Sequence, residues 1–374
     1  MSEAPVLFEE RTSGAGKCIG IATLNSEKTL NALTFDMVQI LLEKLRQWQT
    51  DNSIACVFIQ GAGQKALCAG GDIQQLYRSA VEQPGGPCKE AEDFFELEYR
   101  MDYLLHTYSK PIICWGHGIV MGGGLGVLAG CSHRIVTEKT RMAMPEVTIA
   151  LFPDVGGSWF LNRMPGRVGL FLALTAAQMN GPDCIYTGIA DRFIASEHQE
   201  ALLEALFSLV WNEDSDQHKE QITQLLRAFE ANSAELKPPG NVAEHYNIIQ
   251  ELTDQDDFYQ IVDAISSVET DDAWLARASS GLAHGSPISA CNIYQALDKT
   301  RHMSLAEVFQ FELMLSTNIV RHPEFSEGVR ALLIDKDKNP RWQYAATRDV
   351  PKQLMASMIT PPWPTNPLAN IATH

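Results

Sequence analysis

Two glycine-rich turns, each between a buried strand and a helix, constrain the fold of this chain more than any other feature of its sequence. The first is Cys68-Ala69-Gly70-Gly71-Asp72-Ile73, and the second is Met121-Gly122-Gly123-Gly124-Leu125-Gly126. The strands predicted before them, at 54–59 and 111–115, are apolar on both faces, as buried strands are. Glycines let backbone N–H groups approach a ligand closely, and a helix that begins there adds unpaired donors. The sequence therefore predicts an α/β fold with two sets of accessible backbone donors.

Strands and helices alternate in the N-terminal half of the chain. Strand-like segments at 6–8 and 18–24, with the turn Ser13-Gly14-Ala15-Gly16 between them, predict a hairpin. Thr34 is a good N-cap for a helix whose apolar residues recur at intervals of three and four. Asp72 is a second N-cap. Further helices are predicted at 90–109, 125–131, 156–163 and 166–178, and a further strand at 133–137.

From about residue 198 the chain becomes acidic and almost entirely helical. Helices are predicted at 199–209, 217–231 and 253–267, and a capping box at Ser304–Glu307 opens one that runs to about Val320. A short helix at 325–333 follows, and the proline-rich tail from Pro351 onward is expected to be irregular. We therefore predict two domains, a core at residues 1–197 that carries the functional site and a mainly helical region at residues 198–374.

Composition excludes several classes of protein. The formal net charge of -17 argues against nucleic acid and anionic membranes as partners. No apolar run reaches membrane-spanning length, and the first residues, Met1-Ser2-Glu3-Ala4-Pro5, have neither the basic nor the apolar part of a secretory signal. The eight cysteines are scattered, without a C-x-x-C pair, so we expect reduced core residues in a reducing compartment. No cluster of Cys and His predicts a metal site.

Two acids lie in the otherwise apolar stretch 144–157, where Glu146 follows Pro145 and Asp154 follows Pro153. Acids in apolar surroundings are usually paired, hydrogen-bonded or functional. Two carboxyls in one apolar pocket titrate at different pH values, which suits one to act as a base or nucleophile and the other as an acid. The alternative is structural: Glu146 opens a turn, and Asp154 caps a helix that begins near Gly156.

A third acid, Glu98, falls within the apolar stripe of the helix predicted at 90–109. It stands four residues after Phe94 and three before Met101. An acid that faces the core is costly unless it has a partner or a task. The alternative is that Glu98 lies at the edge of the stripe and reaches solvent.

These features resemble the crotonase (enoyl-CoA hydratase/isomerase) superfamily and, within it, the 3-hydroxyisobutyryl-CoA hydrolases. Two glycine-rich turns can jointly supply two backbone N–H groups, which with a pair of carboxylates form an oxyanion hole and its acid–base residues. The resemblance covers about residues 18–342. It rests on Leu30–Leu33, Cys68–Ile73, Met121–Gly126, the stretch 144–157 with Phe152–Gly157, and Phe325–Ala331.

The resemblance implies a spiral of repeated ββα units followed by C-terminal helices, and a coenzyme A thioester as substrate. The backbone N–H groups of Gly71 and Gly123 would bind the thioester oxygen. In the hydratases one catalytic acid matches Glu146, and the other stands where this chain has Gly126. The hydrolase pattern instead has acids at Glu146, Asp154 and Glu98, all of which are present.

The implied reaction is hydrolysis of a short 3-hydroxyacyl-CoA, with 3-hydroxyisobutyryl-CoA of valine degradation as the expected substrate. Glu146 would attack the carbonyl or activate water, Asp154 would donate a proton or position the substrate hydroxyl, and Glu98 would help to bind water or that hydroxyl. Two alternatives stay open. One is an enoyl-CoA hydratase or isomerase, which Gly126 disfavours, and the other is a non-catalytic acyl-CoA-binding or scaffold protein.

Partners and compartment follow from the same reasoning. Coenzyme A belongs to the substrate, so no separate cofactor is expected. Its phosphates need cations, for which Lys28 and Lys65 are weak candidates. A homo-oligomer is compatible with the sequence. The lack of an Arg- and Ser-rich leader favours the cytoplasm, with the mitochondrial matrix as the expectation for a eukaryotic protein.

Overall fold

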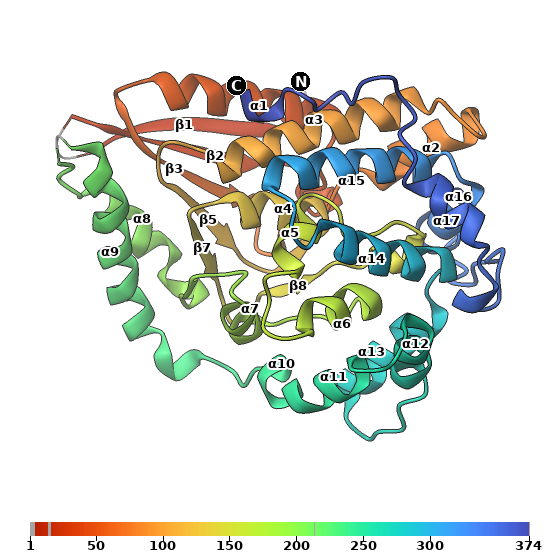
Figure 1. Ribbon diagram of the computed structural model, residues 1–374. Coiled ribbons are helices and arrows are strands. Elements are labelled where there is room, and N and C mark those ends of the chain that lie inside the picture. Colours follow the sequence, from red (N-terminus) through yellow and green to blue (C-terminus); the bar gives the residue numbers. More distant parts are fainter. Residues whose placement is uncertain (1–3, 14–15, 213, 374) are drawn as a thin grey trace. The chain divides into compact units, whose positions relative to one another are not determined.

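The computed structural model describes residues 4–13, 16–212 and 214–373 (Figure 1). Its contacts group the chain into two units of three segments each. Unit 1 contains residues 1–71, 104–142 and 179–243, and unit 2 contains 72–103, 143–178 and 244–374. This grouping differs from the predicted boundary at residue 197, because the segments 72–103 and 143–178 pack with the C-terminal helices.

Unit 1 contains two sheets. The larger has the order β1 (Val6–Thr12), β2 (Cys18–Leu24), β3 (Ile54–Gly61), β5 (Ile112–Gly116), β7 (His133–Val136) and β9 (Arg192–Phe193). Only β1 and β2 pair antiparallel, and each later neighbour is parallel. The smaller sheet has the order β4 (Ala66–Cys68), β6 (Ile119–Met121) and β8 (Arg141–Ala143), of which Ala143 falls in unit 2.

The two sheets arise from a repeated pattern of two strands. In the pairs β3–β4, β5–β6 and β7–β8, the first strand joins the large sheet and the second joins the small one. A helix follows the first two of these pairs, as α1 (Phe35–Thr50) follows β1 and β2. The predicted α/β fold of repeated ββα units is therefore confirmed, as is the N-terminal hairpin. Gly14 and Ala15 of its predicted turn lie outside the described residues.

Several predicted boundaries were wrong. The strands β4, β6 and β8 were not predicted, because three residues are too few to show an alternating pattern. Helix α4 (Gly123–Gly130) begins two residues earlier than predicted, within the glycine triplet itself. The helix predicted at 253–267 is the end of α11 (Tyr246–Thr253) followed by α12 (Phe258–Ser266).

The core of unit 1 lies between the large sheet and its C-terminal helices. Phe58 of β3 and Trp115 of β5 are fully buried, and Leu202 of α8 (Gln199–Phe207) and Leu226 of α9 (His218–Asn232) belong to the same cluster. Figure 1 shows these two helices in green beside the strands. Unit 1 also contains α7 (Gly181–Thr187) and most of α10 (Asn241–Glu244).

Unit 2 is helical. Besides α11 and α12 it contains α2 (Ile73–Glu82), most of α3 (Lys89–His106), α5 (Gly157–Leu161), α6 (Val168–Thr175), α13 (Ala273–His284), α14 (Pro287–Thr300), α15 (Leu305–Val320), α16 (Pro323–Val329) and α17 (Lys352–Met358). The predicted N-caps Asp72 and Ser304 are confirmed: Asp72 accepts from the Gln75 N–H, and Ser304 forms its capping box with Glu307. No described helix is long and apolar enough to cross a membrane.

The expectation of an irregular tail was only partly right. Lys352–Met358 forms α17, and Leu368 and Ile371 are buried. The Asn318 side chain of α15 donates to the carbonyls of Met358 and Thr360, at 2.8 and 2.9 Å. The tail is therefore held on α15 by specific contacts.

Candidate active site

The two glycine-rich turns lie side by side in unit 1. Strands β4 and β6 pair in parallel, with Cys68 opposite Val120, so the turns that follow them leave the sheet at the same edge. A Cβ atom at Gly124 would lie 2.3 Å from the Cys68 carbonyl oxygen, and one at Gly70 would lie 3.7 Å from the Gly123 nitrogen. Gly70 and Gly122 also have positive φ angles, of 111° and 50°. Only glycine fits these positions without strain.

This packing places the two predicted donors close together. Gly123 is the first residue of α4, so no helical carbonyl precedes it to accept its N–H. Gly71 forms an isolated parallel bridge with Leu33, which fixes the first turn. The geometry permits the two N–H groups to point at one oxygen, as an oxyanion hole requires.

The three predicted acids belong to unit 2 and are buried. Glu98, Glu146 and Asp154 expose 3%, 5% and 4% of their surface. Glu98 therefore faces the core and does not reach solvent. Glu146 does open a turn, the 3₁₀ helix Glu146–Ile149, but its side chain is not solvated there. The structural alternative for Asp154 was wrong, because the N-cap of α5 is Gly156.

Two residues that the sequence did not single out hold Asp154 and its loop. The Tyr99 hydroxyl on α3 donates to Asp154 Oδ2 at 2.6 Å, and Ser316 Oγ on α15 lies 2.6 Å from the same hydroxyl. Glu312, also on α15, accepts from the N–H groups of Gly156 and Ser158 through its two oxygens, each at 2.8 Å. The loop after Asp154 is thus fixed by a buried carboxyl group.

Glu312 could have been found from the sequence. It stands in the apolar run Phe311-Glu312-Leu313-Met314-Leu315, and it is the same signal, an acid among apolar residues, that singled out Glu146 and Asp154. Tyr99 gave no such signal, because a tyrosine in the apolar stripe of a helix is usually a core residue.

Burial dominates the ionisation of this cluster. It raises the pKa of Glu98 and of Glu146 well above the ordinary range, and the nearby Asp154 raises both further. Burial also raises the pKa of Asp154, but the Tyr99 hydrogen bond opposes it and the result is about 6. The pKa of Glu312 is raised to about 8, against the two backbone N–H donors that lower it. No cation is among the main causes of these four shifts.

The three acids therefore act as one coupled group in which Asp154 ionises most readily. Two of their oxygens, Oε1 of Glu98 and Oε2 of Glu146, are buried and accept no hydrogen bond from any described protein group. Such atoms are rare in folded proteins, and each of these two oxygens can accept a hydrogen bond from a ligand or water. The cluster can therefore hold and transfer protons next to a bound polar group.

The remaining predicted site residues are in unit 1. Lys28 and Lys65 are both exposed, on the 3₁₀ turn Glu27–Thr29 and directly before β4. Gly126 is buried in the first turns of α4, so no acid stands there. The described residues contain no group of three or more His, Cys, Asp or Glu placed to hold a metal ion.

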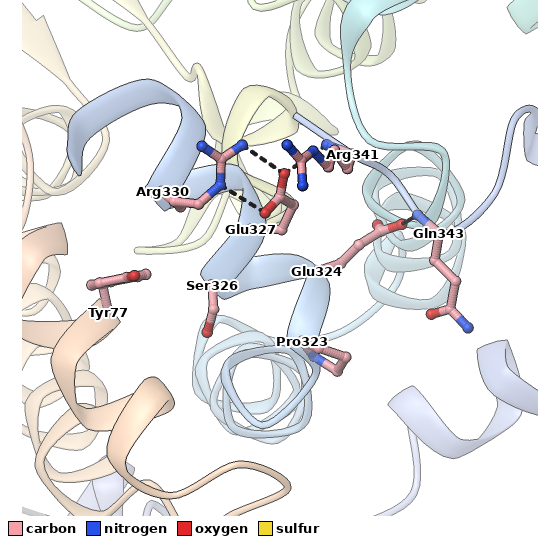
Figure 2. A pocket seen from close by; sticks show the side chains of 8 residues that line it. All are labelled: Tyr77, Pro323, Glu324, Ser326, Glu327, Arg330, Arg341 and Gln343. Atoms are coloured by element: carbon pink, nitrogen blue, oxygen red, sulfur yellow. Dashed lines mark hydrogen bonds and ion pairs between the residues drawn. The ribbon is translucent and has the colours of Figure 1, made fainter. Parts of the chain in front are cut away.

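A separate pocket of about 440 Å³ lies in unit 2 and contains none of the predicted site residues (Figure 2). Its Arg330 is neutralised by Glu327, Asp335 and Asp337, at 2.8, 2.6 and 2.8 Å. Figure 2 shows Arg341 beside Glu327, whose Oε1 accepts from the Arg341 backbone N–H at 2.7 Å. The lining residues are Tyr77, Pro323, Glu324, Ser326, Glu327, Arg330, Arg341 and Gln343.

Comparison with known proteins gives consistent results. A curated relative from Danio rerio, named 3-hydroxyisobutyryl-CoA hydrolase, mitochondrial, is 37% identical over 351 residues, which cover 94% of this chain and 88% of the relative. A crystal structure of a carnitinyl-CoA dehydratase from Mycobacterium thermoresistibile is 32% identical, with a TM-score of 0.84, and the match covers 97% of this chain and 98% of the other.

A second crystal structure, of an enoyl-CoA hydratase from Rhodobacter sphaeroides, is 31% identical, with a TM-score of 0.80 and coverage of 96% and 98%. These similarities extend over both units, and they agree with the crotonase fold expected from the sequence. A family model described as enoyl-CoA hydratase/isomerase matches residues 19–359. The chain therefore belongs to the enoyl-CoA hydratase/isomerase family.

Proposed function

We propose that this chain hydrolyses the thioester of a short 3-hydroxyacyl-CoA, with 3-hydroxyisobutyryl-CoA as its substrate in valine degradation. The observation that carries the proposal is the buried cluster of Glu98, Glu146 and Asp154, whose ionisations are coupled. The relative named as a 3-hydroxyisobutyryl-CoA hydrolase supports the choice of reaction and acyl group.

The proposal gives each residue a part in the reaction. The backbone N–H groups of Gly71 and Gly123 bind the thioester oxygen and stabilise the negative charge that develops on it. Glu146 attacks the carbonyl carbon or activates the water that does so, and Asp154 supplies the proton that the leaving thiolate needs. Glu98 binds the attacking water or the substrate hydroxyl.

The order of the pKa values adds a step to this scheme. In the free protein burial raises the pKa of Glu146 well above its ordinary value, whereas Asp154, with a pKa of about 6, ionises more readily. A protonated Glu146 must pass its proton on before it can act as base or nucleophile. Asp154 is the acceptor we propose, because it then holds the proton that the leaving group requires.

The first experiment follows free thiol with purified protein and (S)-3-hydroxyisobutyryl-CoA, with crotonyl-CoA and acetyl-CoA as comparisons. We expect thiol release from the hydroxy substrate alone. Glu146→Gln should reduce turnover by at least about 10²-fold and spare substrate binding, because the amide keeps the shape but cannot act as base or nucleophile. Full activity of this variant would refute the assignment of Glu146.

An enoyl-CoA hydratase or dehydratase is the second candidate, favoured by the descriptions of the two solved structures that are 32% and 31% identical. It predicts loss of enoyl absorbance from crotonyl-CoA without thiol release. We disfavour it because the buried Gly126 stands where the hydratase pattern has its second acid. The relative's name places that protein in mitochondria, and for this chain we propose a reducing compartment, the cytoplasm or the mitochondrial matrix.

A further inference from the structure

The buried contacts around Asp154 assign a role to two residues outside the proposed catalytic set. Tyr99 exposes none of its surface, and its ring packs against Phe95 and Phe309, with centroids 6.0 and 5.8 Å away. The ring packing alone would serve equally well with phenylalanine. The hydroxyl is what distinguishes this residue, and a hydroxyl is costly to bury unless it is bonded.

The direction of the two hydrogen bonds at this hydroxyl follows from its single proton. The Tyr99 proton is donated to Asp154 Oδ2, so the tyrosine oxygen must accept the second bond, and Ser316 Oγ donates it. Ser316, like Tyr99, is fully buried. The result is a chain of donors, Ser316 to Tyr99 to Asp154, in which each bond strengthens the next.

We propose that Tyr99, supported by Ser316, is a positioning residue that holds Asp154 through Oδ2 and keeps its carboxylate available as the proton acceptor. This inference rests on the proposed function. The hydroxyl fixes one oxygen of Asp154 and leaves the other to exchange protons with Glu146 and the reactants. Three more carboxyls surround this site, Glu98 from α3, Glu146 from the 3₁₀ turn and Glu312 from α15, and each disfavours a further charge.

The ionised form of Asp154 gains most from this arrangement. A hydrogen bond to a charged acceptor is stronger than a hydrogen bond to a neutral one. Without the Tyr99 hydroxyl only a backbone hydrogen bond would still oppose the effect of burial on the pKa of Asp154, and Asp154 would ionise at higher pH.

The test compares Tyr99→Phe and Ser316→Ala with wild type across pH. Tyr103→Phe is the matched control, because Tyr103 lies one turn further along α3 and its ring contacts the same Phe309, at 6.1 Å. For Tyr99→Phe we expect the acid limb of kcat/KM to move up by about one pH unit. Ser316→Ala should move it in the same direction by less, and Tyr103→Phe should leave it in place.

A second measurement does not depend on activity. Since the hydroxyl favours ionised Asp154, Tyr99→Phe should lower the urea midpoint of unfolding more at about pH 8 than at about pH 5. If the role of Tyr99 is purely structural, Tyr99→Phe lowers the urea midpoint equally at both pH values and leaves the acid limb of kcat/KM at its wild-type pH. That result would overturn the inference. Wild-type protein without hydrolase activity would instead refute the proposed function, and the unfolding comparison would still decide the role of Tyr99.

Discussion

At the scale of single residues, the candidate site contains several acids in buried positions, where the ionised form of an acid is unfavourable. Glu98, Glu146, Asp154 and Glu312 are all buried, and desolvation is the largest cause of every one of their pKa shifts. A folded protein tolerates such groups by keeping most of them protonated. The lowest pKa, that of Asp154, belongs to the acid that accepts the hydrogen bond from Tyr99.

This order of ionisation predicts how activity depends on pH. Asp154 must be ionised to accept the proton of Glu146, so activity should be present above about pH 6 and fall as the pH drops through that value. In Asp154→Asn the limb near pH 6 should vanish and kcat should fall by about 10²-fold or more. Asp93→Asn, which changes an exposed carboxylate on α3, should keep both the limb and the rate. A limb that survives in Asp154→Asn would assign it to another group.

Some residues of the candidate site could be predicted from the sequence and others could not. Glu146 and Asp154 were singled out as candidates because an acid in an apolar run is conspicuous. Glu98 stayed undecided between core and solvent because the register of a helix cannot be read that finely from sequence. The roles of Tyr99 and Ser316 depend on a contact across 217 positions of sequence, and no local pattern contains it.

At the scale of elements, α15 organises the acid cluster of unit 2. Its Glu312 accepts from two N–H groups of the loop after Asp154, and its Ser316 supports Tyr99. The capping box of α15 was predicted correctly, because it is a local pattern. Its contacts with the loop after Asp154 were not predicted, because that loop is distant in sequence.

The clamp made by Glu312 can be tested by its effect on stability. In Glu312→Gln only one oxygen remains to accept, so one buried N–H is left unsatisfied, at a cost of about 1–3 kcal/mol. The folded pKa of about 8 is raised above the ordinary 4.5, so wild type loses stability as the pH rises between these values, and the amide does not. The urea midpoint of unfolding of Glu312→Gln should therefore fall further below that of wild type at about pH 5 than at about pH 8.

Glu307→Gln supplies the control for this comparison. Glu307 lies on the same helix but is exposed, and its hydrogen bonds to Ser304 lower its pKa, so it is ionised throughout this pH range. The difference in urea midpoint between wild type and Glu307→Gln should be the same at the two pH values. If the difference in urea midpoint between wild type and Glu312→Gln is also equal at the two pH values, Glu312 does not change its charge in this range.

At the scale of the whole molecule, the fold class could be predicted from the sequence, but the division of the chain into two units could not. The alternation of strands and helices predicted an α/β fold, whereas the ββα repeats were expected only from the family resemblance, because β4, β6 and β8 are too short to show a pattern. The segments 72–103 and 143–178 read as parts of the same alternation, yet they pack with helices more than a hundred residues away in sequence. Such long-range packing is not visible in local periodicity.

The C-terminal tail belongs to this long-range packing and can be tested as a unit. Removing residues 351–374 exposes the surfaces that Met358, Leu368 and Ile371 cover. It also removes the Met358 carbonyl that accepts from Asn318 on α15 and the Pro367 carbonyl that accepts from Arg100 on α3. We expect a lower melting temperature and reduced thiol release, because these two helices carry Tyr99 and Glu312.

Point variants separate the tail contacts from the loss of chain length. Asn318→Ala should also lower the melting temperature, but by less, since it removes only the hydrogen bonds to the Met358 and Thr360 carbonyls, of about 0.5–1.5 kcal/mol each. Gln353→Ala, at an exposed position of α17, should change neither property. A truncated protein that melts and hydrolyses like wild type would show that the tail is dispensable.

The alternation of the two units along the chain has a consequence for synthesis on the ribosome. The chain passes from one unit to the other at residues 71, 103, 142, 178 and 243, so neither unit is a continuous stretch of polypeptide. Unit 1 is complete only after residue 243 has been made, and unit 2 only after the last helices have been added. The nascent chain therefore carries the strands of its large sheet, and their apolar faces, for most of translation before either unit can close.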